Sequence, residues 1–299
     1  MSALAAWFLA QPSRTRFFPI WVVGVTVCAS CATGPLSRDM VGAVVAPPDL
    51  VARALIEFDR AVLLKPRDSD GGLEERLAPL IVLEIAEPIG QRFTNAGFGA
   101  ARFDSQGRFR IDASRPTLYT DRSRITIRNV EYEQVCYLWW FPPTRPDSAA
   151  TARTSGGVRI TLGEDGFPLV WEVLGSRGQT EAIFVSASLE RAAVEAFGRP
   201  LPGRRHAVER RIANKAAAPV VRVLEDGPIP MGPYIYFDAK THGVTTLLCR
   251  CMPSQVQRFV GTKYYDLAPV EELGGWRRWK QRGVNSTVEG GLQHALRWP

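Results

Sequence analysis

Two cysteines separated by a single residue, Cys249 and Cys251, are the residues whose type and spacing most favour chemistry in this chain. If a β-strand runs through both, their side chains project from the same face, so the two thiols lie side by side. Such a pair can bind a soft metal ion, with His242 and Cys136 completing the ligand set. We expect no disulfide between the two, because an extended strand would have to distort to form one.

Three interpretations of these cysteines remain open on sequence grounds. The thiols can be inert, small apolar side chains in a core. Cys136 can instead form a disulfide with Cys249 or Cys251 in an oxidising compartment. The third interpretation is a metal or thiol site made of Cys249, Cys251, His242 and Cys136. Structural zinc sites normally have two close ligand pairs, whereas this chain has one, so we expect no cofactor.

Patterns that mark common enzymes are missing from the sequence. There is no G-x-S-x-G turn, no phosphate-binding P-loop and no H-E-x-x-H zinc motif. The chain has three histidines, which leaves few candidates for a catalytic base. We therefore assign no catalytic residue and favour a non-catalytic protein. The alternative is a hydrolase-like enzyme, or a metal-binding protein, with its site near Cys249, Cys251 and His242.

The net charge of +7 is carried mostly by arginine, which suits contact with phosphate or carboxylate groups. Two segments concentrate it, the basic run 204–211 and the aromatic, basic run 276–280. We favour a solvated helix with local pairing to Glu209 for the first and tryptophans packed on the domain for the second. We expect no nucleic acid partner. The candidate anion contacts are Arg204, Arg205, Arg210, Arg211, Arg277 and Arg278.

The elements that position these residues are predicted to be two helices and a series of hairpins. Asp49 can cap a helix that ends at Pro66, with Leu55, Phe58 and Val62 on one face. A second helix is predicted from Ser188 to about Phe197. Strands are predicted at 80–85, 124–141, 181–185 and 220–224, and hairpins across 103–109, 158–174 and 225–254.

These elements predict an α+β fold, an antiparallel sheet built from hairpins with two or three helices packed on it. We see no alternation of strands and helices that would indicate parallel pairing. The last hairpin offers a register test. A two-residue His242-Gly243 turn places Tyr236 opposite Cys249, and a three-residue turn places Ile235 there.

The N-terminus has the features of a secretory signal peptide. Arg14 and Arg16 precede an apolar run over residues 17–27, and small residues follow it. The apolar run is too short to cross a bilayer, which takes about 20 residues. Residues 1–30 are therefore predicted to direct export.

The tripeptide Ala29-Ser30-Cys31 resembles the end of a bacterial lipoprotein signal, although Cys28 stands where that family has Leu or Val. The resemblance implies cleavage before Cys31 and lipidation of its thiol. The mature chain would then lie on the periplasmic side of a bacterial membrane. Ordinary secretion, with Cys31 left as a free thiol, is the alternative.

The predicted organisation is a signal peptide (1–30), a tether (31–48) and one domain (49–299) that ends in a basic, aromatic tail from about residue 269. The predicted function is that of an envelope-anchored lipoprotein with a non-catalytic binding or structural module. Its expected partners are the membrane, through the lipid anchor, and another component of the cell envelope.

Overall fold

The computed structural model describes residues 58–67, 71–85, 97–103, 109–142, 155–176, 178–210, 218–239, 241–254, 256–273, 292 and 295–299. Contacts divide the chain into two units, Met1–Arg38 and Asp39–Pro299, and every described residue belongs to the second. The predicted signal peptide, the lipidation site and the tether lie outside the described residues. No helix in the described part is long and apolar enough to cross a membrane.

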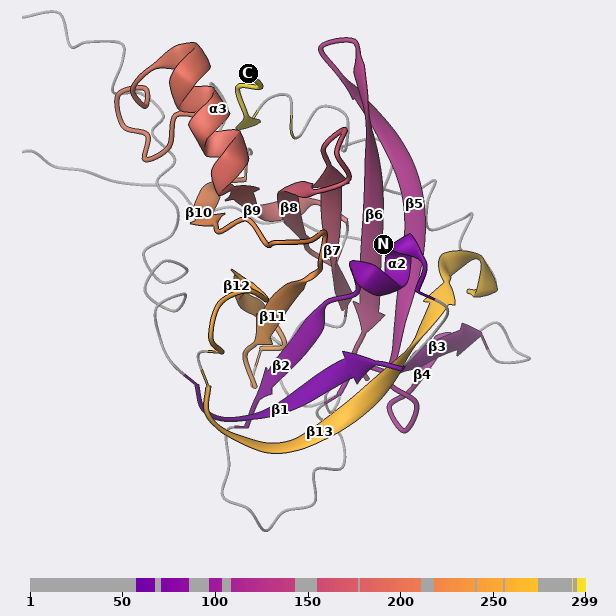
Figure 1. The fold of residues 1–299 in the computed structure, drawn as a ribbon. Coiled ribbons are helices and arrows are strands. Elements are labelled where there is room, and N and C mark those ends of the chain that lie inside the picture. The colour runs from indigo at the N-terminus through magenta and orange to yellow at the C-terminus, as the bar shows by residue number, and fades with distance from the viewer. Residues whose placement is uncertain are drawn as a thin grey trace, which may run out of the picture. The chain divides into compact units, whose positions relative to one another are not determined.

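One mixed sheet of eleven strands dominates the described part (Figure 1), in the order β10-β9-β8-β7-β6-β5-β13-β1-β2-β11-β12. A separate pair is formed by β3 and β4. The strands are β1 (Phe58–Pro66), β2 (Leu80–Glu84), β3 (Ala100–Phe103), β4 (Phe109–Asp112), β5 (Thr117–Ile127), β6 (Val130–Trp140), β7 (Ser155–Leu162), β8 (Pro168–Leu174), β9 (Thr180–Ser186), β10 (Val220–Leu224), β11 (Pro233–Phe237), β12 (Val244–Cys249) and β13 (Val256–Pro269).

The α+β prediction is wrong, because the described residues are mostly strand and form a nearly closed, barrel-like sheet. Its two edge strands, β10 and β12, lie in contact with each other. The α-helices in the described part are α2 (Leu73–Arg76) and α3 (Ala187–Phe197), and a short 3-10 helix, η2 (Val270–Glu272), follows β13. The sheet is also not purely antiparallel. β13 pairs in parallel with both β1 and β5, and β11 pairs in parallel with β2.

The helix predicted from Asp49 to Pro66 is wrong over its described half, where Phe58–Pro66 forms β1. Burial explains the error. Phe58 and Ala61 pack in one buried cluster, whereas Val62 and Leu64 pack in another. A strand buried on both faces has no clean alternation, so its apolar spacing can match a helix. The remainder of the predicted helix, residues 49–57, lies outside the described residues.

Most of the predicted strands are confirmed. Those at 80–85, 181–185 and 220–224 correspond to β2, β9 and β10, and the hairpin across 158–174 forms β7 and β8. β3 and β4 form the arms of the hairpin predicted across 103–109.

The single strand predicted over 124–141 is wrong, because a turn interrupts it. Arg128 and Asn129 both have positive φ, 52° and 65°, and Ile127 pairs with Val130 across them. A two-residue loop with both φ values positive matches a type I′ turn, which joins β5 to β6 tightly. The turn was missed because it lacks the glycine that usually marks it.

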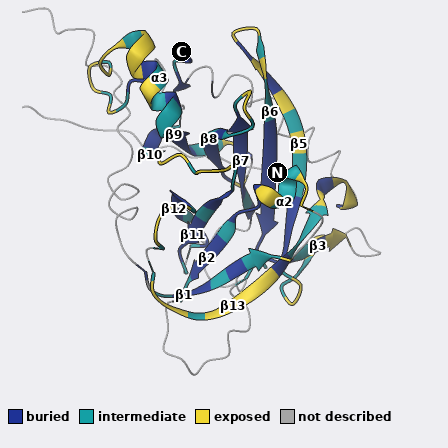
Figure 2. Cartoon of the chain, in the orientation of Figure 1, coloured by how far each residue is buried: buried dark blue, intermediate teal, exposed yellow. Residues whose placement is uncertain are grey.

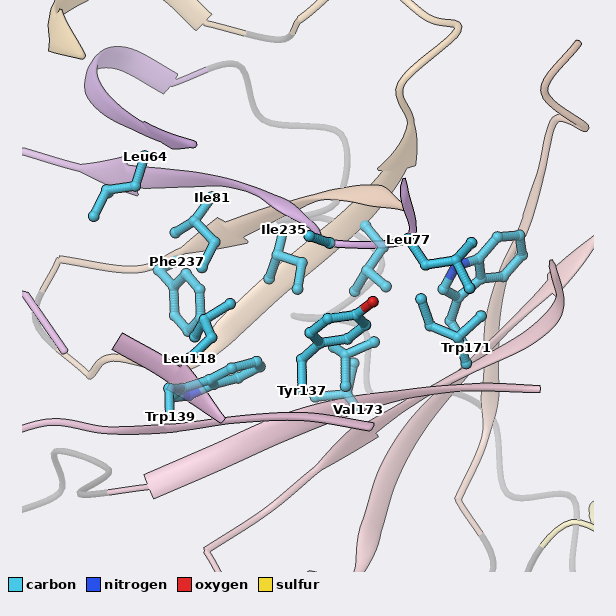
Figure 3. Close-up of a cluster of buried hydrophobic side chains, with 14 of the residues drawn as sticks. Leu64, Leu77, Ile81, Leu118, Tyr137, Trp139, Trp171, Val173, Ile235 and Phe237 are labelled. Carbon is cyan, nitrogen blue, oxygen red and sulfur yellow. The ribbon is translucent and has the colours of Figure 1, made fainter. Parts of the chain in front are cut away.

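β6 is covered on both faces, as its sequence predicts. Val135, Tyr137 and Trp139 belong to the main core inside the curled sheet, part of which Figure 3 shows. Cys136 and Trp140, which alternate with them, lie in a cluster on the other face with residues from β3 and η2. Figure 2 shows the dark blue of buried residues along β6, whereas β13 is largely exposed.

The helix predicted from Ser188 is confirmed as α3, but Ser186 is its N-cap, and its hydroxyl accepts a hydrogen bond from the Leu189 amide. Leu189 and Ala193 are its buried residues. α3 connects β9 to β10, which pair in parallel, so this part of the described chain forms a β-α-β crossover that the sequence did not reveal.

Candidate functional site

Cys249 and Cys251 form a disulfide with each other, with their Cα atoms 5.2 Å apart. The expectation that this pair stays unlinked is therefore wrong, and so is the alternative of a disulfide to Cys136, which has a free thiol. Among the described residues no group of three or more His, Cys, Asp or Glu side chains is placed to hold a metal ion.

The disulfide forms because the strand ends at its first cysteine. β12 stops at Cys249, and the Met252 amide donates a hydrogen bond to the Cys249 carbonyl at 3.0 Å, which closes a turn. In a continuing strand, Cα atoms two residues apart would be separated by about 6.8 Å. That separation is at the upper limit for disulfides, and the turn reduces it to 5.2 Å, well within their range. The error in prediction was to extend the strand through Cys251.

The hairpin register also differs from both predictions, because Pro233 pairs with Cys249 in place of Tyr236 or Ile235. The loop between β11 and β12 is longer than three residues. Asp238 organises it by accepting hydrogen bonds from the amide and hydroxyl of Thr241, both at 2.7 Å. Since the loop length fixes the register, the cysteines lie beside the start of β11.

The two sulfur atoms have different surroundings. Cys249 is 7% exposed, whereas Cys251 is exposed at the surface. The Cys251 amide donates a hydrogen bond to the Cys249 sulfur at 3.1 Å. The Cys251 sulfur lies 4.0 Å from the carbonyl oxygen of Asp226. The disulfide therefore joins a buried cysteine, whose sulfur accepts a hydrogen bond, to an exposed one.

A small recess adjoins the disulfide at the seam where β10 and β12 approach each other. It has a volume of about 20 Å³, which is room for about one water molecule. Cys249, Arg250 and Pro233 line it together with Trp171 and Ile229. Pockets that enclose small molecules have volumes of several hundred cubic ångströms, so this recess is a surface feature and not a substrate cavity.

α3 positions the segment that faces the disulfide. The Asp226 carboxylate accepts hydrogen bonds from the amide and the hydroxyl of Ser188, at 3.2 and 3.0 Å, and pairs with Arg191 at 2.9 Å. These bonds hold the chain just after β10 against the first turn of α3. They place the Asp226 carbonyl next to Cys251. No local sequence pattern marks Asp226, because its role depends on a contact across 38 residues.

His242 does not join the cysteines. It lies in the loop at the opposite end of β12, and the six-residue strand spans roughly 17 Å at a rise of about 3.4 Å per residue. Its ring is buried and stacks on Phe141, with the ring centroids 4.1 Å apart. Its φ of 53° shows that it also supplies a left-handed position in the loop. The structure therefore does not bring together the four residues predicted as a metal or thiol site.

Cys136 lies in a second polar arrangement, which is buried. It pairs across the strands with Arg159, and Arg159 pairs with Glu172. The Arg159 guanidinium donates two hydrogen bonds to the Glu172 carboxylate, at 2.7 and 2.8 Å, and both side chains are almost fully buried. Thr180 donates a further bond to Glu172 at 2.8 Å. We call Cys136, Arg159, Glu172 and Thr180 the buried ladder.

Burial raises the pKa of the Cys136 thiol to about 12. The thiol therefore remains protonated at neutral pH, and a protonated thiol is neither a nucleophile nor a good metal ligand. The positive charge of Arg159 lowers the pKa of Cys136, but this effect is smaller than that of burial.

The Arg159–Glu172 pair has a partial signal in the sequence. Each is the single charged residue of its strand, and the two lie five and six residues from the predicted turn at 164–166. A symmetric hairpin would place Arg159 opposite Trp171, and the register shift between Thr161 and Leu162 brings Glu172 there instead.

The basic segment 204–210 is not the solvated helix that we considered. Glu209 is buried and accepts hydrogen bonds from the amides of Arg205 and His206, at 2.7 and 2.8 Å. The next two amides, of Ala207 and Val208, donate to Glu190 in α3. This segment is therefore a connection fixed to α3. Burial lowers the pKa of His206.

The anion-contact prediction is neither confirmed nor contradicted. Arg205 and Arg210 are exposed, and Arg204 is half-buried. Arg211, Arg277 and Arg278 lie outside the described residues, so whether the two basic segments share a face stays open as a prediction.

No protein-family model, curated protein or solved structure matches this chain.

Proposed function

We propose that this chain is an envelope-anchored lipoprotein whose β-rich module serves as a non-catalytic binding or structural unit on the periplasmic side of a bacterial membrane. The observation that carries the proposal is the Cys249–Cys251 disulfide in combination with the lipobox-like Ala29-Ser30-Cys31. Disulfides persist in the periplasm and at cell surfaces but are rare in the cytosol. The disulfide and the signal therefore support the same compartment independently.

The experiment replaces the proposed lipidated residue in the full chain expressed with its own signal. With Cys31→Ala, we expect the protein to leave the membrane fraction and to lack the acyl mass on its N-terminal peptide. Cys28→Ala is the matched control, because it removes a neighbouring thiol but keeps the proposed acceptor. It should remain acylated and in the membrane fraction.

Two outcomes would contradict the proposal. One is a Cys31→Ala protein that still fractionates with membranes and shows no loss of acyl mass. The other is loss of membrane association in both variants alike, which would show that the apolar run and not the lipid holds the chain.

A further inference from the structure

We propose that the Cys249–Cys251 disulfide is a thiol–disulfide exchange site that accepts electrons from a cysteine pair in an extended polypeptide. The proposal goes beyond the non-catalytic function proposed above, because it gives the module a redox reaction. It does not depend on the lipid anchor, because it rests on the geometry of the turn after β12.

The two sulfurs are arranged for attack from one side. Cys251 is exposed, whereas Cys249 is 7% exposed. An incoming thiolate therefore reaches the Cys251 sulfur first, and Cys249 becomes the leaving group. Exposed disulfides are the labile ones in proteins, and the rate of exchange increases as the leaving thiolate becomes more stable.

The turn can stabilise the Cys249 thiolate that the attack produces. The Cys251 amide already donates a hydrogen bond to the Cys249 sulfur at 3.1 Å. A bond from N–H to sulfur strengthens when the sulfur becomes charged. Arg250, between the two cysteines, adds a positive charge, and positive charge lowers the pKa of a neighbouring thiol.

The site also accommodates the reduced Cys251. Its sulfur lies 4.0 Å from the Asp226 carbonyl oxygen, to which a thiol can donate a weak hydrogen bond. Asp226 is held by Ser188 and Arg191 of α3. Both oxidation states therefore find hydrogen-bond partners at fixed positions.

The reaction balances in two steps. The partner's first thiolate bonds to the Cys251 sulfur, the Cys249–Cys251 bond breaks, and its electron pair stays on Cys249 as thiolate. The partner's second thiolate then attacks the partner sulfur of this mixed disulfide and releases Cys251. The partner dithiol loses two electrons and two protons, and Cys249 and Cys251 take them up as two thiols. Another disulfide can reoxidise the pair by the same steps in reverse.

The surroundings favour an extended chain as the partner. The adjoining recess holds about one water molecule and so cannot enclose a small substrate. Ile229, which lines the recess, and Met252, which follows Cys251, are 61% and 46% exposed. Apolar side chains next to an exposed disulfide can contact the residues that flank a partner's cysteines.

The test uses the oxidised full chain and a reduced synthetic peptide with two cysteines flanked by leucines. After quenching with a thiol-alkylating reagent, each cysteine is assigned by peptide mapping. We expect one peptide disulfide to form for each pair of newly alkylated Cys249 and Cys251. The Cys249→Ala/Cys251→Ala variant is the matched control, since it keeps every other cysteine. Equal peptide oxidation in both proteins would overturn the proposal.

Single variants test the direction of attack. With oxidised glutathione, Cys249→Ser should form an adduct on Cys251 at least about tenfold faster than Cys251→Ser forms one on Cys249, because of the difference in exposure. Cys136 reports on folding, because it should resist alkylation in every folded variant. Equal or reversed rates in proteins with unlabelled Cys136 would refute the assigned roles.

Two further comparisons test the surroundings. Arg250→Gln should slow peptide oxidation several-fold, whereas Arg258→Gln, an exposed arginine on β13, should not. The leucine-flanked peptide should also react faster than the same peptide with serines in place of leucines. If both peptides react equally fast, the exposed apolar residues do not select the partner and the polypeptide assignment fails.

Discussion

The buried ladder on β6–β9 and the disulfide turn after β12 place cysteine in opposite environments. Cys136 is enclosed by strands on both sides and pairs with Arg159, and burial raises its pKa to about 12. Cys251 lies at the surface where a strand ends. The comparison shows that position in the sheet decides whether a thiol is inert or accessible.

The charged residues of the two regions also differ in their burial. Arg159 and Glu172 are buried and bind each other through two hydrogen bonds, whereas Arg250 lies in a turn at the surface recess. A buried ion pair is costly to break, because the remaining charge stays in a low-dielectric interior. The ladder is therefore expected to govern stability, and the turn is expected to contribute little to it.

The largest predicted effect is that of removing one charge from the ladder. Glu172→Gln leaves Arg159 buried without a counter-ion and should reduce the free energy of unfolding by about 3–5 kcal/mol, measured by urea denaturation. The control is Glu131→Gln, which breaks a pair with Arg124 whose side chains are 58% and 70% exposed. It should cost less than about 1 kcal/mol.

If Glu172→Gln does not fold, the double replacement Arg159→Met/Glu172→Leu should restore a stable protein, because it removes both charges together. Equal costs for Glu172→Gln and Glu131→Gln would show that the ladder is not the stabilising region.

The next largest effect is the part of the pH dependence of stability that comes from the Cys136 thiol. The folded thiol has its pKa raised to about 12 from an ordinary value of 9.0, so above pH 9 the unfolded chain binds fewer protons than the folded one. The free energy of unfolding should then fall by about 1.4 kcal/mol per pH unit between pH 9 and 12, and this contribution is fully present below pH 9.

The measurement compares wild type with Cys136→Ala by urea denaturation at several pH values from 8 upward, which subtracts the titration of the buried tyrosines. We expect the difference between the two proteins to be constant below about pH 9 and to change above it. If the difference in unfolding free energy stays constant up to the highest pH, the Cys136 thiol ionises at the same pH in the folded and unfolded protein, and its pKa is not raised by burial.

The smallest effect is expected at the turn. Cys249 and Cys251 close a loop of only three residues, so chain entropy predicts that the disulfide contributes about 1–2 kcal/mol. Thermal unfolding of Cys249→Ala/Cys251→Ala should show a correspondingly small fall in Tm, and a reductant should lower the Tm of wild type but not of the variant. A loss as large as that of Glu172→Gln would mean that the disulfide is structural.

The strands around the ladder were predictable because their signals are local. Gly166 has a φ of 77°, as its place in the turn between β7 and β8 requires, and the apolar residues of β6 alternate between two covered faces. The candidate site was predictable only in part. The spacing of Cys249 and Cys251 identified the right residues, but His242 and Cys136 lie elsewhere.

The sequence by itself determined the hairpins, the strand-dense centre and the cysteine pair, because turn chemistry and alternation act over a few residues. Only the tertiary structure decided the parallel pairing of β13 with β1 and β5, which joins segments about 200 and 150 residues apart. It also decided where β12 ends. That end point places Cys251 in a turn next to Asp226 and so favours the disulfide that an extended strand would disfavour.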